Sequence, residues 1–166
     1  MRRPIKNVFA QHDYNCFGCS PYNNIGLRLK FYEIDDYIES EWITATQYEG
    51  YPGAVHGGIL STMIDEVAAW TMYIKARCAG VTSRMNIRYR KPVNSLGEKI
   101  ILRGKLREIK RNLCYVDVWL LNENDEICAE GEVIYFTFSL EKSIKECFFP
   151  EDFNSFFEDD NDLTSH

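Results

Sequence analysis

The sequence predicts an α+β fold in which a curved antiparallel sheet of about six strands wraps one long central helix. Two strand-like stretches come first, one segment with helical periodicity follows, and four longer strand-like stretches complete the order. Short connections join most of the strands, which is typical of antiparallel hairpins. Because a single helix must be covered by the sheet, we expect the sheet to curl around it.

The length of 166 residues, with 45% apolar content, suits one domain with a real core. We expect that domain over residues 1–140, including an N-terminal extension, and an acidic, aromatic tail over residues 141–166. The tail holds eight acidic residues and five phenylalanines. The sequence leaves open whether it docks through its aromatic side chains or stays mobile.

The strands are predicted from runs rich in β-branched and aromatic residues. Residues 26–34 and 37–45 form the first two, and Asp35-Asp36 between them suits a turn. The later strands are expected at residues 81–91, 98–109, 113–122 and 126–139.

The helix is expected from Gly58 to about Ala79, with Gly80 as its stop. One stripe should pack on the sheet; it consists of Ile59, Leu60, Met63, Val67, Trp70 and Ile74. The opposite face carries Ser61, Asp65, Ala68 and Met72. A water-exposed face normally carries Lys, Glu or Arg, so we expect this face to meet another protein surface.

The formal net charge of −6 argues against non-specific binding to nucleic acid. Residues 84–111 nevertheless hold ten basic side chains against two acidic ones. Such an excess could attract a compact anionic ligand, although basic residues often simply alternate with core residues along exposed strand faces. The ten are Arg84, Arg88, Arg90, Lys91, Lys99, Arg103, Lys105, Arg107, Lys110 and Arg111.

Six scattered cysteines and the lack of an apolar leader predict free thiols and a cytoplasmic protein. We find no segment apolar enough to span a membrane. The pair Cys16 and Cys19 supplies two of the four ligands of a structural zinc site. The histidines His12, His56 and His166 are far apart in sequence, so we expect a packed turn at the cysteine pair and no metal.

Two neighbouring carboxylates lie within the helix. Asp65 is the first functional candidate because the residues that share its face are small or apolar. Glu66 lies about 100° further round the helix. Glu66 therefore lies at the edge of the stripe that packs on the sheet, where we expect its carboxylate to pair with an arginine of a strand.

The helix begins at His56-Gly57-Gly58, where two residues without side chains leave unpaired amides accessible. Helix starts of this kind bind anions or developing oxyanions. From Gly58 to Asp65 the helix rises about 10 Å. If the amides and the carboxylate serve one reaction, they should come from two copies of the chain, which predicts a homodimer with two shared sites.

The stretch HGGILSTMID, from His56 to Asp65, resembles a signature of the hotdog-fold acyl-CoA thioesterases of the phenylacetate-pathway and 4-hydroxybenzoyl-CoA type. The stretches YPGAVHGG, CFGC…NNIGLRLKF and MNIRYRKPV extend the resemblance over about residues 16–139. It implies a hotdog fold and hydrolysis of an acyl-CoA thioester without a metal or other cofactor. Self-association to a dimer or tetramer, with no nucleic-acid or membrane partner, is also expected.

The resemblance implies roles for particular residues. The Gly58 amide, alone or with Gly57, would polarise the thioester carbonyl. Asp65 of the partner subunit would act as nucleophile or general base. His56 would shape the loop or contact the thioester.

Further residues are implied as substrate contacts. Thr82 and Ser83 begin the strand after the helix, where relatives can assist the carboxylate or the water. Arg90, Lys91 and Arg111 are the candidates for the coenzyme A phosphates.

The sequence departs from this pattern at one position. Relatives often carry Asn or Gln about six residues before the histidine, and this chain has Gly50 there. The alternative function is therefore a hotdog module that binds acyl-CoA or a fatty acyl ligand without turnover.

Overall fold

The computed structural model describes residues 1–11 and 13–157. Seven strands form one antiparallel sheet in the order β1-β2-β3-β7-β8-β9-β6. They are β1 (Arg2–Ile5), β2 (Phe31–Ile34), β3 (Tyr37–Ile43), β7 (Lys99–Lys110), β8 (Leu113–Leu121), β9 (Ile127–Thr137) and β6 (Gly80–Tyr89). A small hairpin joins β4 (Glu49–Tyr51) to β5 (Ala54–Val55). The predicted architecture is confirmed, with β1 as one strand more than expected.

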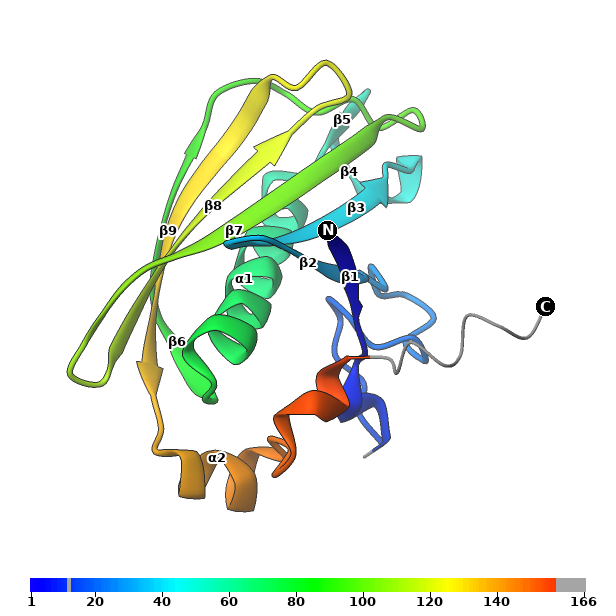
Figure 1. The fold of residues 1–166 in the computed structure, drawn as a ribbon. Helices are drawn as coiled ribbons and strands as arrows, with labels where there is room; N and C mark the ends of the chain where they lie inside the picture. The colour runs from blue at the N-terminus through cyan, green and yellow to red at the C-terminus, as the bar shows by residue number, and fades with distance from the viewer. Residues whose placement is uncertain (12, 158–166) are drawn as a thin grey trace.

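Helix α1 (Gly57–Thr71) lies against the concave face of the sheet (Figure 1). It continues as a π-helical turn, η3 (Met72–Ala76), and ends where Arg77 adopts a left-handed conformation with φ of 54°. The expected end near Ala79, with Gly80 as the stop, is therefore wrong by about one turn. The left-handed residue turns the chain early, so Gly80 instead begins β6.

The helix is buried almost all round. Val67 and Trp70 of the expected stripe are fully buried, and so are Ala68 and Met72 on the opposite face. The expectation that another protein surface covers Ala68 and Met72 is wrong, because the sheet of the same chain curls past them. A Cβ added to Gly80 in β6 would lie only 3.0 Å from the Met72 sulfur.

A close approach between helix and sheet depends on a glycine. A Cβ added to Gly131 in β9 would lie 2.8 Å from Cγ2 of Ile64, a distance that packed carbon atoms do not tolerate. The absence of a side chain at this position lets the central strands pack directly on α1.

Both ends of the described chain cover the remaining side of α1. These segments are η1 (Val8–Gln11), α2 (Leu140–Cys147) and η4 (Phe153–Phe156). Phe9 and Phe156 pack edge-on against Trp70, and Phe157 bridges to Ile5 of β1. In Figure 1 the last described residues lie beside the N-terminal segment. The described part of the tail thus docks through its aromatics; residues 158–166 and His12 lie outside the described residues.

All six cysteines are free thiols. Within the described part of the chain, none of the helices combines the length and apolar character needed to cross a bilayer.

Candidate active site

The carboxylate of Asp65 lies between α1 and the strands β6 and β9. Its Oδ1 accepts a hydrogen bond from Thr82 Oγ1 at 3.0 Å and another from the Tyr135 hydroxyl at 2.8 Å. The same hydroxyl lies 2.7 Å from the Asp65 backbone oxygen. Two donors therefore fix one carboxylate oxygen, while Oδ2 accepts no hydrogen bond from the described residues.

Tyr135 is a site residue that sequence reasoning missed. Its side chain is 2% exposed, and burial, followed by the negative charge of Asp65, raises its pKa well above the usual value. The hydroxyl therefore stays protonated and acts as a donor to the carboxylate. Tyr135 lies directly opposite Thr82 in the pairing of β6 with β9, so the correct strand register would have placed both beside the helix.

The start of α1 differs in one respect from the expected oxyanion site. His56 is the N-cap, and its Nδ1 accepts a hydrogen bond from the Gly58 N–H at 2.8 Å. The Gly58 amide is thus already occupied. The Gly57 N–H comes before the first intrahelical hydrogen bonds, so it is free to donate to another acceptor.

The histidine also packs closely against Gly50. A Cβ added to Gly50 would lie 2.9 Å from Cδ2 of His56. The imidazole thus packs against the position at which the resemblance led us to expect Asn or Gln.

A second tyrosine lies at the helix start. The Tyr89 hydroxyl donates to the Gly57 carbonyl oxygen at 2.9 Å and also forms a hydrogen bond with Ser61 Oγ. A shallow pocket beside it brings together three predicted residues, Gly57, Arg90 and Lys91. Tyr89 was not predicted as a site residue.

Most of the predicted basic excess is neutralised within the chain. Arg90 pairs with Glu130 at 2.5 Å, and Lys91 pairs with Glu126 at 2.6 Å. Ion pairs also engage Lys99, Arg103, Lys105, Arg107 and Lys110. Among the described residues, only Arg84, Arg88 and Arg111 of the ten lack an ion pair.

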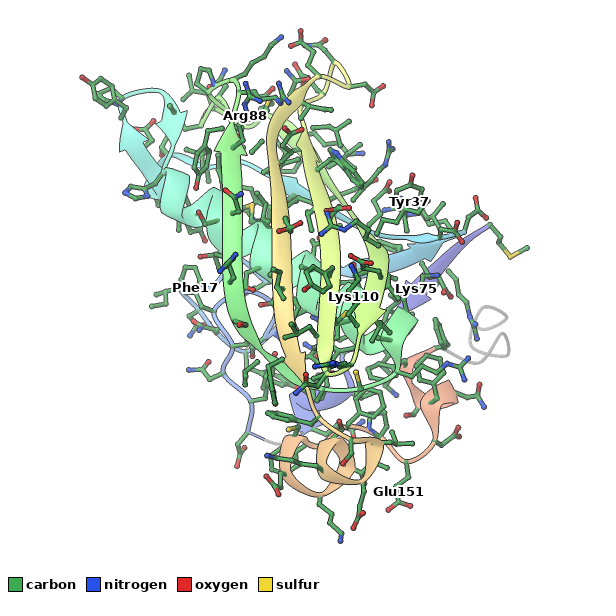
Figure 2. All side chains as sticks on the ribbon, turned by 90° about the vertical axis from the view of Figure 1, so that its left-hand side faces the viewer. Phe17, Tyr37, Lys75, Arg88, Lys110 and Glu151 are labelled. Carbon is green, nitrogen blue, oxygen red and sulfur yellow. The ribbon has the colours of Figure 1, made fainter. Side chains whose placement is uncertain are left out.

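Two predicted contacts lie apart from the others. Arg111 lies in the turn between β7 and β8. The next residue, Asn112, accepts a hydrogen bond from the backbone N–H of Thr137 at one end of β9. Arg90 instead donates its backbone N–H to Cys128, at the other end of β9. Figure 2 shows this separation through Arg88 and Lys110, which lie toward opposite ends of the sheet. Ser83 is exposed in a bulge of β6, next to Thr82.

Glu66 does not pair with a strand arginine, so that expectation is wrong. Its carboxylate accepts a hydrogen bond from Trp70 Nε1 at 3.3 Å and lies 3.5 Å from the sulfur of Cys16. Burial, followed by the negative charge of Cys16, raises the pKa of Glu66 to about 8. The N-terminal loop, which the sequence pattern did not place against the helix, covers this side of α1.

Strand β6 forms one edge of the sheet, since it pairs only with β9. Apolar side chains along it are exposed: Val81 to 54%, Met85 to 39% and Tyr89 to 49%. An unpaired edge with exposed apolar residues is a ready surface for another strand.

Comparison with known proteins finds a family model that matches the central region of the chain. Residues 52–129, from the loop before α1 into β9, match the model of the thioesterase superfamily. Over these residues the chain is similar to proteins of that superfamily. The matched region contains His56, Gly57, Gly58 and Asp65.

Individual proteins and solved structures show a similarity of the same kind. Over 87 residues the chain is 29% identical to acyl-coenzyme A thioesterase 13 of Mus musculus, across 51% of this chain and 61% of the mouse protein. A thioesterase protein of Streptococcus pneumoniae, solved with coenzyme A, gives a TM-score of 0.62 at 21% identity, over 67% of this chain and 86% of that one. The E. coli PaaI protein of the phenylacetic acid degradation operon gives a TM-score of 0.62 at 17% identity, over 68% of this chain and 81% of that one.

These comparisons show that the fold is the hotdog fold. The chain covers only about three fifths of the mouse relative, 61% of its length.

Proposed function

We propose that the protein is an acyl-CoA thioesterase, which hydrolyses a thioester to a free acid and coenzyme A. The observation that carries this proposal is the carboxylate of Asp65, held by Thr82 and Tyr135 with one oxygen unengaged. An oriented carboxylate of this kind can activate water or attack an acyl carbon. The superfamily match and the mouse relative, which is named an acyl-coenzyme A thioesterase, support the same reaction class.

The proposed site is shared between two copies of the chain. Within one protomer, the start of α1 and Asp65 are separated by about 10 Å of helix, too far to act on one carbonyl. Thr82, which donates to Asp65, belongs to β6, and the outer edge of that strand is unpaired. A second copy of the chain that pairs with this edge therefore approaches the carboxylate. Asp65 of the partner subunit then faces the amides that start α1.

In the reaction, the Gly57 N–H donates to the thioester carbonyl oxygen and stabilises the negative charge that develops on it. The Gly58 N–H joins only when His56 turns away, since its Nδ1 occupies that amide at rest. As a general base, Asp65 takes a proton from a water molecule whose oxygen bonds to the acyl carbon; as a nucleophile, it bonds to the acyl carbon itself, and water then hydrolyses the resulting anhydride. In both routes the carbon–sulfur bond breaks, and coenzyme A leaves as a thiolate that takes up a proton. Thr82, with the neighbouring Ser83, keeps the carboxylate or water in place.

Coenzyme A enters as part of the substrate, and the proposed hydrolysis uses no metal or other cofactor. Arg90 and Lys91, beside the pocket at Gly57, would contact its phosphates by exchanging Glu130 and Glu126 for phosphate oxygens. The solved structure of the Streptococcus pneumoniae protein with coenzyme A supports a ligand of this class. Arg111 lies at the far end of β9, so it would reach that ligand only from the partner subunit. The free thiols fit a reducing compartment such as the cytoplasm.

The test is release of thiol from short-chain, long-chain and aromatic acyl-CoAs by the full chain, compared with Asp65→Asn. Loss of the carboxylate should lower the rate about 10²- to 10⁴-fold. Unchanged turnover in the variant would reject Asp65.

A binding module without turnover remains the second candidate. It is favoured by two observations at the helix start: His56 occupies the Gly58 amide, and Gly50 supplies no side-chain amide. Saturable binding of acyl-CoA by the wild type, with no thiol released from any of the three substrate classes, would select this alternative.

A further inference from the structure

Two cysteines and a glutamate that are distant in sequence meet on the side of α1 away from Asp65. Sulfur atoms of Cys16 and Cys19 and a carboxylate oxygen of Glu66 all lie within 4.8 Å of one another. The Cys16 sulfur is 3.5 Å from one carboxylate oxygen and 3.7 Å from the other. The sequence supplied only the cysteine pair, because Glu66 comes from the helix.

The acidic groups of this cluster have no basic partner among the described residues. No lysine, arginine or histidine of the described residues forms an ion pair with Glu66. Its neighbours are thiols and the rings of Tyr14 and Trp70. A half-buried carboxylate beside two thiols is costly in its charged form unless a cation compensates for it. The cluster has the donor types, two thiolates and a carboxylate, that bind Zn²⁺.

Each of the three side chains is held by one further group. The Gly18 N–H donates to the Cys16 sulfur at 3.3 Å, Trp70 Nε1 donates to Glu66 at 3.3 Å, and the Tyr14 hydroxyl lies 3.0 Å from the Cys19 sulfur. Hydrogen bonds of this kind orient metal ligands and are typical of built metal sites.

The loop that carries the cysteines is shaped for close contact with Glu66. A Cβ added to Gly18 would lie 2.5 Å from Oε2 of Glu66, so only glycine allows the loop to approach the carboxylate. The backbone of the loop is fixed by Leu27 N, which donates to Phe17 O at 2.8 Å, and by Leu29 N, which donates to Gly18 O at 2.9 Å. Figure 2 shows Phe17, between the two cysteines, beside the helix.

We propose that Cys16, Cys19 and Glu66 bind one Zn²⁺ ion, with a water molecule as the fourth ligand. Tetrahedral zinc with its usual bond lengths separates a sulfur and an oxygen ligand by about 3.6 Å. The distances from Cys16 to the two oxygens of Glu66, 3.5 and 3.7 Å, already match this value. Binding releases the thiol protons to solvent, so that two thiolates and the carboxylate face the ion.

The ion would take no part in the proposed reaction. Glu66 follows Asp65 in α1 but points to the N-terminal loop, whereas Asp65 points to β6 and β9. The metal would therefore tie the loop to the helix turn that carries Asp65, without contact with the proposed reaction.

The test uses the full chain, kept reduced, stripped of metal with a chelator and titrated with Co²⁺ and then Zn²⁺. We expect saturation at about one metal per chain. A thiolate-to-cobalt charge-transfer band should appear with Co²⁺ and disappear when Zn²⁺ displaces it. Zn²⁺ should also raise the melting temperature of the wild type.

Variants assign the ligands. Cys16→Ser and Cys19→Ser should each weaken Zn²⁺ binding at least 100-fold, and Glu66→Gln should weaken it about 10- to 100-fold while keeping the cobalt band. The matched control is Cys78→Ser, which alters another half-buried free thiol and should bind like the wild type.

The proposal is overturned if the reduced wild type shows no cobalt band, or if Cys16→Ser keeps it. It is equally overturned if Cys78→Ser loses it, or if the wild type forms a Cys16–Cys19 disulfide in air and, once reduced, binds no metal. If circular dichroism shows that a cysteine variant does not fold, the proposal is judged on the wild type alone. It then stands or falls with the cobalt band and with the rise in melting temperature on addition of Zn²⁺.

Discussion

The hydroxyl of Tyr135 in β9 lies 2.8 Å from Oδ1 of Asp65, and the two residues are 70 positions apart in sequence. The ring is 2% exposed, so the contact joins the inner face of the sheet to the helix. Because the pKa of Tyr135 is raised, the hydroxyl remains a donor and stabilises the charged carboxylate.

Tyr135→Phe removes this donor and keeps the ring. We expect the thioesterase rate to fall about 10- to 150-fold, because one hydrogen bond to a charged group contributes about 1.5–3 kcal/mol. Steady-state kinetics on one acyl-CoA measures the loss. Tyr115→Phe, a change to a half-buried tyrosine on β8, is the control and should keep full activity. A Tyr135→Phe enzyme as fast as the wild type would remove Tyr135 from the site.

Gly50→Ala tests the packing of His56 at the helix start. The new Cβ would lie 2.9 Å from Cδ2 and 3.0 Å from Cα of His56, so the ring and the backbone that carries it must shift, which disturbs the hydrogen bond with Gly58. We expect a loss of about 1–3 kcal/mol in the free energy of unfolding, measured by urea denaturation.

The double variant with His56→Ala provides the control for this clash. Since alanine removes the ring that Gly50→Ala displaces, the double variant should lose less stability than the sum of the two single variants. Simple additivity would contradict the packing explanation.

Met85→Glu tests the exposed edge of β6. Met85 is 39% exposed there, and a buried charge at the dimer interface would be costly. We expect the variant to be monomeric by light scattering and to lose most of its thioesterase activity. Ile43→Glu places the same charge on an apolar residue, 57% exposed, at the end of β3, and should remain dimeric and active. A dimeric Met85→Glu would place the interface elsewhere.

The sequence predicted the parts of the fold that depend on local pattern. The strands β7, β8 and β9 begin and end within two residues of their expected bounds because their alternation and turns are read locally. Strand β1 was not predicted, because it has only four residues and contains Pro4. Helix α1 ended early because Arg77, rather than a glycine, adopted the left-handed conformation.

The site was predicted less completely, since its contacts join distant segments. The order of residues placed Asp65 on the helix and Thr82 on the following strand, but not the hydrogen bond between them. Tyr135 and the Cys16–Glu66 contact depend on strand register and loop docking, which a single sequence does not specify. The helical periodicity predicted that another protein surface covers Ala68 and Met72, because periodicity alone does not show how far the sheet of the same chain curls.

The shared site is the central claim, and mixed dimers test it most directly. One parent is Asp65→Asn. The other is Gly57→Pro, which removes the first helix amide; proline suits the first helical position, and His56 before it already has the extended backbone, φ −59° and ψ 133°, that proline requires.

Each parent alone should be inactive. In a mixed dimer, one site combines an intact helix start with an intact carboxylate, so random exchange of subunits should restore about a quarter of the wild-type rate. Confirmed subunit exchange with no recovery of thiol release would contradict a site built from two copies of this chain.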